Sequence, residues 1–293
     1  MVELILGTVQ LGLDYGINNR YGKPDIEKSF EMLDYAFNNG IKILDTANAY
    51  GDSESVIGQY ISNTGNEFKI ATKFSSFDNS IDIHDFFNNQ LLSSLELLSK
   101  DKIDYYLIHN FNDLVENYDI LNLLKNNDKI LNIGISLYEP SELEFILRNF
   151  SKDIDFVQIP FNILDSRWIN DDLLTRTKEE NIKIFVRSIF VQGLIFMDDE
   201  HEINKIHPVL KDYIDFIRKL SFEKNVPINR LAMDYVKSYS EIDGILIGCD
   251  TIGQLKENIY QFNSDIIFNK EDINNIINLT KNIPNKIIDP RRW

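Results

Sequence analysis

Cysteine is almost absent from this chain of 293 residues. With Cys249 as its single cysteine, the chain can form no intrachain disulfide, which is compatible with a reducing compartment. No apolar run approaches the roughly 20 residues that span a bilayer. The N-terminus also lacks the basic and apolar segments of a signal peptide. The sequence therefore predicts a cytoplasmic protein that does not enter a membrane.

Positive charge is scarce as well, because 30 Lys and Arg residues stand against 46 Asp and Glu residues and give a net charge of −16. No Lys- or Arg-rich stripe offers the basic face that a nucleic-acid-binding protein needs, so we expect no nucleic-acid partner. An anionic cofactor stays compatible with this charge, because its binding depends on the local field. Zinc and calcium motifs are missing too, and we expect no metal site.

What the sequence does contain is a regular alternation of short apolar runs and longer helical stretches. Eight runs rich in β-branched residues have the continuous apolar character of strands buried on both faces. They span residues 4–8, 41–46, 68–73, 103–109, 130–136, 155–160, 182–188 and 243–248. Helical spacing is clear in 25–40, where Ile26, Phe30, Leu33 and Phe37 recur every three or four residues. Further helical stretches are roughly 81–99, 114–126, 139–149, 170–181, 227–240 and 251–262.

This alternation, repeated eight times, predicts an α/β fold of the (β/α)8 type, a TIM barrel, as a single domain over residues 1–293. A doubly wound sheet is the alternative, but it usually carries a GxGxxG turn after its first strand. The segment GTVQLGLDYG has glycines without that spacing. Longer connections at 161–169 and 189–226 follow the sixth and seventh strands, where a barrel builds its substrate pocket.

Polar residues end three consecutive strands. Asp45 ends the second strand and Tyr50 follows it, Lys73 ends the third strand, and His109 ends the fourth. The carboxyl ends of barrel strands open on the face where barrel enzymes place their chemistry. Taken singly, an Asp–Lys pair can be structural and a His or Tyr can simply pack. All four on consecutive strands favour a common site.

The four side chains have complementary roles in the reduction of a carbonyl group. The developing alkoxide needs a proton, which Tyr50 can donate. A tyrosine has a pKa near 10, and we expect the ammonium of Lys73 to lower it. Asp45 would keep Lys73 charged in a closed pocket, and His109 would hydrogen-bond the carbonyl oxygen. A lyase that forms a Schiff base on Lys73 is an alternative.

Several longer segments extend this pattern over nearly the whole chain. They are GTVQLG (7–12), GIKILDTANAYGDSESVIG (40–58), ATKF (71–74), YYLIHN (105–110), NIGISLYEPSEL (132–143), VQIPFNILD (157–165) and LIGCDTIGQLKENI (246–259). Together they resemble the aldo-keto reductase family. The resemblance implies a carbonyl reductase that uses NADPH, with NADH not excluded, and a catalytic tetrad of Asp45, Tyr50, Lys73 and His109.

The same resemblance implies a set of cofactor contacts. Ser136 and Gln158 would hold the carboxamide of the nicotinamide. Arg187 stands where the family often stacks an aromatic ring on the nicotinamide, and Ser188 follows it. Contacts to the rest of the cofactor would come from Gly248, Cys249, Asp250, Thr251, Gln254, Glu257 and Asn258.

Two departures from the family pattern affect these contacts. The usual Ser-Asn pair reads Ser136-Leu137 here, so one amide contact is missing or replaced. Many relatives that prefer NADPH carry basic residues in the late loop. None lies between Gly248 and Gln254, and Asp250 would repel a phosphate, which leaves NADPH and NADH both open. The helix that starts near Thr251 can still offer backbone N–H groups to an anion.

We expect a small carbonyl compound as substrate. The segments GTVQLGLDYGI, SIFVQGLIF and DPRRW resemble bacterial family members of surface-polysaccharide or nonulosonic-acid pathways, which raises a sugar-linked carbonyl as a hypothesis. Substrate loops are expected at 14–24, 74–80, 110–113, 161–169 and 189–207 and in the C-terminal tail. Apolar walls could come from Phe74, Phe161, Trp168, Phe190 and Trp293, each of which could equally belong to the ordinary core.

Two questions stay open at the level of sequence. A cofactor-binding regulatory or partner subunit with the same fold and little turnover is the alternative function. The chain is compatible with a monomer or a homo-oligomer.

Overall fold

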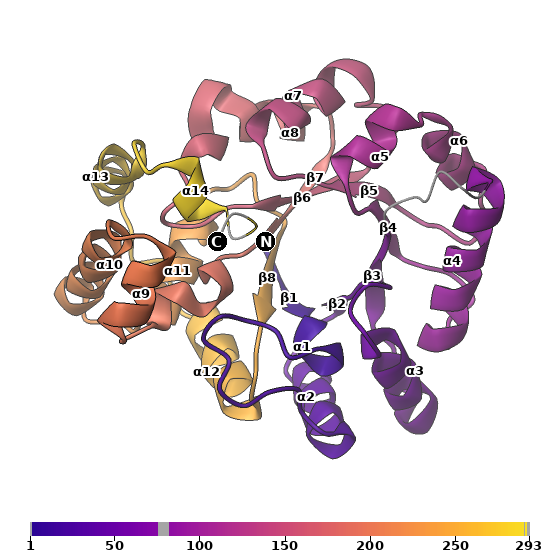
Figure 1. The fold of residues 1–293 in the computed structure, drawn as a ribbon, viewed down its shortest axis with the longest axis horizontal. Coiled ribbons are helices and arrows are strands. Elements are labelled where there is room, and N and C mark those ends of the chain that lie inside the picture. The colour runs from indigo at the N-terminus through magenta and orange to yellow at the C-terminus, as the bar shows by residue number, and fades with distance from the viewer. Residues whose placement is uncertain (1, 76–81, 290, 292–293) are drawn as a thin grey trace.

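The computed structural model of the chain describes residues 2–75, 82–289 and 291. Its eight strands are parallel and close into one barrel in chain order, with β8 (Gly244–Gly248) paired to β1 (Glu3–Gly7). Helices surround this barrel on its outside (Figure 1). The (β/α)8 fold predicted from the alternation of strands and helices is confirmed.

Each predicted apolar run overlaps one strand. Between β1 and β8 the strands are β2 Ile43–Asp45, β3 Lys69–Phe74, β4 Tyr105–Ile108, β5 Ile133–Ser136, β6 Phe156–Pro160 and β7 Lys183–Arg187. Continuous burial explains why the runs could be recognised, since every residue of β2, β4, β5 and β6 is buried. Strands covered on both faces read as unbroken apolar segments.

The helices fill the connections between the strands. In the first half of the chain they are α1 Val9–Gly12, α2 Ile26–Asn38, α3 Ser53–Thr64, α4 Ile83–Leu98, α5 Phe111–Glu116, α6 Asp119–Lys125 and α7 Pro140–Asn149. In the second half they are η1 Arg167–Asp172, α8 Leu173–Glu179, η2 Val191–Phe196, α9 Glu200–Ile206, α10 Leu210–Lys224, α11 Ile228–Lys237, α12 Ile252–Phe262, α13 Lys270–Thr280 and α14 Asn285–Ile288.

One helix predicted as continuous is interrupted in the structure. The stretch 114–126 contains two helices, because Asn117 adopts an extended backbone after α5. The side chain of Asn117 then accepts the N–H of Asp119 at 3.1 Å and starts α6. An asparagine competes in this way with the helical hydrogen bonds of its neighbours.

The face that α2 buries is also different from the one that the apolar spacing predicts. Leu33 is fully buried, but Ile26 is exposed, and Phe30 and Phe37 lie at the edge of the core. Smaller residues fill the centre of the contact, namely Ser29, Met32 and Ala36. The apolar spacing therefore located the helix correctly and misplaced the centre of its buried face.

Inside the barrel, large side chains fill the half that lies toward the amino ends of the strands. Tyr105, Phe156 and Phe185 form a triangle with ring centroids 5.2 to 5.4 Å apart. Gly134 makes room for it, because a Cβ there would lie 2.3 Å from the Phe156 ring. This packing closes one end of the barrel and leaves space only toward the carboxyl ends of the strands.

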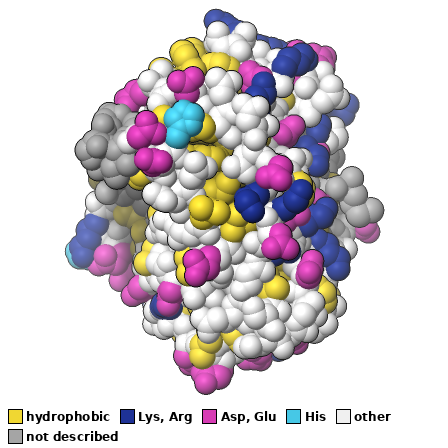
Figure 2. Space-filling model, turned by 90° about the vertical axis from the view of Figure 1, so that its right-hand side faces the viewer, with side chains coloured by type: hydrophobic (Ala, Val, Ile, Leu, Met, Phe, Trp, Pro, Cys, Tyr) yellow, Lys and Arg dark blue, Asp and Glu magenta, His cyan; other side chains and the backbone are white. Residues whose placement is uncertain are grey.

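Among the described residues, no helix has the length and apolarity to cross a membrane. On the face drawn in Figure 2, Lys and Arg side chains are interspersed with Asp and Glu and form no continuous basic surface. The described part of the chain also holds no group of three His, Cys, Asp or Glu side chains arranged to bind a metal ion.

Candidate active site

The alternation of side chains along the strands explains how polar groups reach the barrel opening. Seven strands carry apolar residues of the barrel interior, and those of β2, β3, β4, β6 and β7 include Ile43, Ala71, Leu107, Phe156 and Phe185. Side chains two positions apart share one face of a strand. The residues two positions further on are Asp45, Lys73, His109, Gln158 and Arg187. All five of these polar side chains line one cavity of about 580 Å³.

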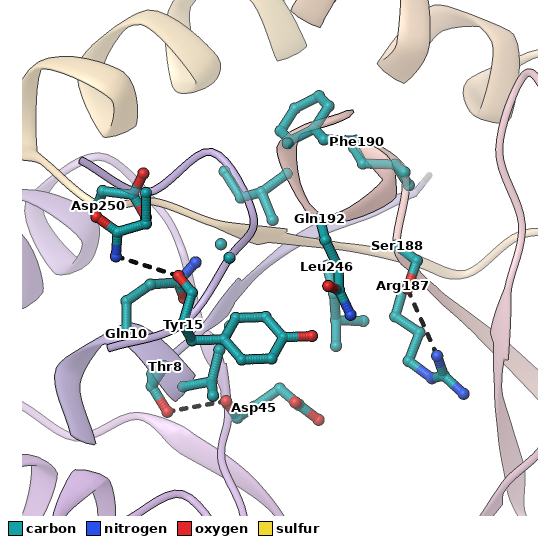
Figure 3. A pocket seen from close by; sticks show the side chains of 18 of the residues that line it. Thr8, Gln10, Tyr15, Asp45, Arg187, Ser188, Phe190, Gln192, Leu246 and Asp250 are labelled. Atoms are coloured by element: carbon teal, nitrogen blue, oxygen red, sulfur yellow. Dashed lines mark hydrogen bonds between the residues drawn. The ribbon is translucent and has the colours of Figure 1, made fainter. Parts of the chain in front are cut away.

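The cavity extends from the strand ends to α12 and is covered by two loops. Tyr15, from the loop after β1, and Gln192, from the loop after β7, lie between the Asp250 side and the Arg187 side of the cavity (Figure 3). Both side chains line the cavity. Two of the predicted substrate loops, 14–24 and 189–207, therefore meet over the cavity.

Lys73 and Asp45 form the buried base of the site. The Lys73 ammonium donates to both carboxylate oxygens of Asp45, at 2.9 and 2.7 Å, and to the Thr46 carbonyl at 2.7 Å. Lys73 is only 1% exposed. Burial by itself lowers the pKa of Lys73, but the charge of Asp45, together with the contribution of the Tyr50 phenol, outweighs burial and raises it. Lys73 is thus held as an ammonium ion.

Tyr50 lies against this ammonium, with the Lys73 nitrogen 4.9 Å from the centroid of its ring. Burial raises the pKa of the Tyr50 phenol, while the Lys73 charge acts in the opposite direction. Lys73 lowers the pKa of Tyr50 as expected, but burial outweighs this effect, which the sequence did not predict, and the net pKa is raised. Desolvation of a phenolate is costly, and one nearby cation offsets only part of that cost. Tyr50 is therefore a protonated phenol at neutral pH.

His109 completes the group, and its ring meets that of Tyr50 edge-on at a centroid distance of 6.4 Å. Burial lowers the pKa of His109 to about 4, with further contributions from the charges of Lys73 and Arg187. The imidazole is consequently neutral at pH 7. A neutral imidazole has one N–H to donate to an oxygen that enters the cavity.

The turn that carries Tyr50 is fixed by close backbone packing. A Cβ on Gly12 would lie 1.7 Å from the Tyr50 carbonyl oxygen, so only glycine permits α1 to approach this turn. The Ser53 hydroxyl donates to the Thr8 carbonyl at 2.9 Å and ties the start of α3 to β1. The Thr8 hydroxyl donates in turn to the Asp45 carbonyl at 2.9 Å. The segment GTVQLG therefore holds the turn that carries Tyr50 through backbone contacts and the hydrogen bonds of Thr8.

Most of the predicted cofactor residues line the same cavity. They are Ser136, Gln158, Arg187, Ser188, Gly248, Asp250, Gln254, Glu257 and Asn258. Cys249 and Thr251 do not belong to the cavity wall. Cys249 is 2% exposed in the core, where burial raises the pKa of its thiol to about 12. Thr251 is the N-cap of α12, and its hydroxyl accepts the Gln254 N–H at 3.2 Å.

Arg187 packs against Tyr138, a contact that the sequence did not predict. Its guanidinium carbon lies 4.0 Å from the centroid of the Tyr138 ring, and its Nη2 donates to the Leu137 carbonyl at 3.0 Å. The guanidinium of Arg291 lies 3.4 Å from the same centroid. Two such groups this close to one ring fit only on opposite faces. The C-terminal segment therefore supports Tyr138 and, through it, Arg187.

Of the aromatic residues considered for the cavity wall, three belong to the core. Phe190 lines the cavity, whereas Phe74, Phe161 and Trp168 are fully buried in the core outside the barrel. Phe74 directly follows the inward-facing Lys73, so the alternation turns it outward. Trp293 and residues 76–80 lie outside the described residues. Of the described residues in 110–113 and 161–169, none lines the cavity.

Several lining residues were missed by the sequence analysis, namely Gln10, Tyr138 and Asn229. Gln10 is 8% exposed, and its side-chain oxygen has no hydrogen-bond partner in the described part of the chain. A buried amide oxygen without a partner is costly, so it marks a place where a ligand hydroxyl or N–H would be stabilised. Gln10 lies in the segment GTVQLG just after β1, and this position could have identified it as a lining residue.

Comparison with known proteins agrees with this geometry. The family model described as "Aldo/keto reductase family" matches residues 3–280. The chain belongs to the aldo/keto reductase family. As a member, it is an oxidoreductase whose general reaction is the NAD(P)H-dependent reduction of a carbonyl group.

Similar members of the family include the aldo-keto reductase YhdN of Bacillus subtilis, at 26% identity over 95% of this chain and 91% of the relative. The D-arabinose 1-dehydrogenase of Saccharomyces cerevisiae is 26% identical over 82% of this chain and 78% of the relative. Among solved structures, the aldo-keto reductase AKR11C1 from Bacillus halodurans, in its holo form, superposes with a TM-score of 0.73. It is 21% identical and covers 94% of this chain and 91% of its own, a likeness that concerns the fold.

Proposed function

We propose that Tyr50, Lys73, His109 and Asp45 are the catalytic residues of this reductase, with Tyr50 as the proton donor. The observation that carries the proposal is their arrangement at the closed end of one cavity. The phenol lies between a paired ammonium and a neutral imidazole. Such an arrangement can bind a carbonyl oxygen and protonate it as negative charge develops.

Each side chain has one task in this proposal. The neutral N–H of His109 orients the carbonyl oxygen toward the Tyr50 hydroxyl. The phenol proton moves to that oxygen, and the Lys73 ammonium stabilises the tyrosinate that is left. Asp45 keeps the ammonium charged and in place. Because its pKa is raised, Lys73 is a poor amine nucleophile at neutral pH, which argues against the Schiff-base lyase.

The residues of the cavity fit a nicotinamide dinucleotide, which supplies the hydride when it is bound. Gln158 donates its amide N–H to Asp45 at 2.7 Å, so its side-chain oxygen is left to accept from a carboxamide. Ser136 ends the neighbouring strand, and Arg187 and Ser188 lie beside that position. Gly248, Asp250, Gln254, Glu257 and Asn258 would hold the adenosine end, and Gln10 offers its unpartnered oxygen beside Gly248 and Asp250.

The substrate is proposed to be a small, polar carbonyl compound. Tyr15, Asn18, Tyr138 and Gln192 also line the cavity, and their polar groups suit a substrate with several hydroxyl groups. A sugar-linked carbonyl is the hypothesis that this lining favours. The name of the yeast relative, D-arabinose 1-dehydrogenase, points to the same class.

The test combines cofactor binding with turnover. We expect NADH or NADPH to quench protein fluorescence on titration, and 4-nitrobenzaldehyde to be reduced. Tyr50→Phe should retain cofactor binding and lose most of kcat, typically about 100-fold or more for a lost general acid. Tyr118→Phe, at a tyrosine 51% exposed on the surface, is the matched control.

Equal turnover by wild type and Tyr50→Phe would remove Tyr50 from the acid role. Cofactor binding without turnover of any aldehyde, ketone or keto sugar would favour the regulatory subunit instead.

A further inference from the structure

We propose that the cavity selects NADH over NADPH and that Asp250 is the residue that rejects NADPH. The inference rests on the proposed function, because it requires the adenosine end of the cofactor to lie along the start of α12. NADPH differs from NADH by a phosphate on the 2′ oxygen of the adenosine ribose. The charges at that end of the cavity therefore determine the preference.

The charged residues of the cavity are divided between its two ends. Among the described residues that line the cavity, the basic ones are Lys73 and Arg187, and both lie at the catalytic end. The end beside α12 carries Asp250 and Glu257. A phosphate placed there would meet two carboxylates and no cation.

Burial raises the pKa of the Asp250 carboxyl, while its hydrogen-bond partners are neutral side chains that do not cancel its charge when it is ionised. Its backbone N–H donates to the Gln254 side-chain oxygen at 2.7 Å, and the Gln254 amide donates back to the Asp250 carboxylate at 3.4 Å. The Gln10 side chain also lies beside Asp250 (Figure 3). In the part of the chain that the structure describes, no ion pair joins Asp250 or Glu257 to a Lys or Arg, and their negative charge is not compensated.

The N-terminus of α12 acts in the opposite direction and is too weak to reverse this effect. A helix N-terminus carries a partial charge of about +0.5, whereas Asp250, just before Thr251, carries a full negative charge. The Thr251 hydroxyl already accepts the Gln254 N–H at 3.2 Å, so one of the free N–H groups is used. The net local field is therefore unfavourable for a doubly charged phosphate.

Basic residues near α12 are engaged elsewhere. Arg230 contacts Asp234 at 3.3 Å and donates to the Asp265 carbonyl at 3.0 Å. Lys256 lies over the Tyr35 ring at 5.2 Å, on the side of α12 that faces α2. Neither lines the cavity, so neither compensates the two carboxylates for a bound phosphate.

NADH suits the same position. Its adenosine ribose presents two neutral hydroxyls, which can donate to the carboxylate that repels a phosphate. Nucleotide-binding folds of another type use an Asp or Glu in this way to bind the ribose of NAD. The unpartnered oxygen of Gln10 is a second acceptor beside Asp250.

The experiment is a fluorescence titration of the wild-type protein with NADH and with NADPH, at low and high salt. We expect NADH to bind at least about tenfold more tightly, equivalent to about 1.4 kcal/mol. High salt should narrow the gap, because screening weakens the repulsion. Asp250→Asn should move the ratio of the two dissociation constants toward NADPH by about tenfold or more. Asp250→Ser tests the same change should the asparagine variant not fold.

Glu96→Gln, on α4 and away from the cavity, removes the same charge and should leave the ratio unchanged. NADPH binding as tight as NADH, or tighter, would overturn the inference and leave the proposed reductase intact. An unchanged ratio in the Asp250 variants would also overturn it. Failure of both dinucleotides to bind would instead refute the proposed function.

Discussion

Asp45→Asn tests the buried base of the active site. In the wild type, the Lys73 ammonium is 1% exposed and is held by two Asp45 contacts and the Thr46 carbonyl. The variant keeps the shape of the side chain and leaves the ammonium with no opposite charge. Removing one partner of a buried ion pair costs about 3–5 kcal/mol, so Tm should fall by about 5–8 °C for a chain of this length.

The pH dependence gives the sharper test. In the wild type the pKa of Lys73 is raised, so the pair stabilises the protein below the unfolded lysine pKa of about 10.4 and is lost as pH rises further. In the variant, burial is no longer opposed and lowers the pKa of Lys73. The loss of stability caused by burying Lys73 without a counter-charge is then largest at neutral pH. It shrinks as pH approaches about 10.4, where lysine is also neutral in the unfolded chain. The difference in Tm should narrow above about pH 9.

Thermal unfolding by circular dichroism between pH 7 and pH 10 measures both effects. Asp101→Asn, at an exposed aspartate, is the control and should change Tm little. The double variant Asp45→Asn/Lys73→Met should recover part of the loss, because the unpaired charge is gone. A Tm for Asp45→Asn equal to that of the wild type at pH 7 would refute a buried, charged Lys73.

Three further predictions concern neighbouring residues. Since the pKa of His109 is lowered to about 4, kcat/KM should show no His109 titration between about pH 5 and 8; an inflection near 6.5 that vanishes in His109→Asn would contradict this. Gly12→Ala should destabilise the protein by about 1–3 kcal/mol and lower kcat, because its Cβ would meet the Tyr50 carbonyl; Gly253→Ala, whose Cβ meets only Thr251 at 3.7 Å, should be neutral or stabilising in thermal unfolding. Arg187→Gln should strengthen binding of the oxidised, cationic nicotinamide relative to the reduced form in paired titrations, and equal ratios in both proteins would place Arg187 away from the ring.

The sequence was informative where one local rule decides the structure. Strands buried on both faces produce continuous apolar runs, so all eight could be located. Lys73 and Asp45 could be assigned to one opening because both end neighbouring strands of a barrel. Phe74 shows the limit of reasoning from strand ends alone. It directly follows Lys73 and was considered for the cavity wall, but side chains alternate along a strand and Phe74 therefore points outward.

Other features depend on quantities that local patterns do not contain. The pKa of Tyr50 is a balance between burial and the Lys73 charge, and its direction requires the depth of the phenol in the cavity. The contact of Tyr138 with Arg187 and Arg291 joins segments far apart in the chain. Cys249 lies between two lining residues and points into the core, a detail that its position in a motif did not reveal.

The two-residue step between the barrel-filling side chains and the polar residues above them has an evolutionary consequence. Deleting one residue from any of these strands would turn its polar group into the helical layer and bring an apolar group into the opening. Changes of length within the strands would thus abolish stability and chemistry together. New substrate preferences in this scaffold should arise by exchange of side chains at fixed strand positions or by remodelling of the loops that carry Tyr15 and Gln192.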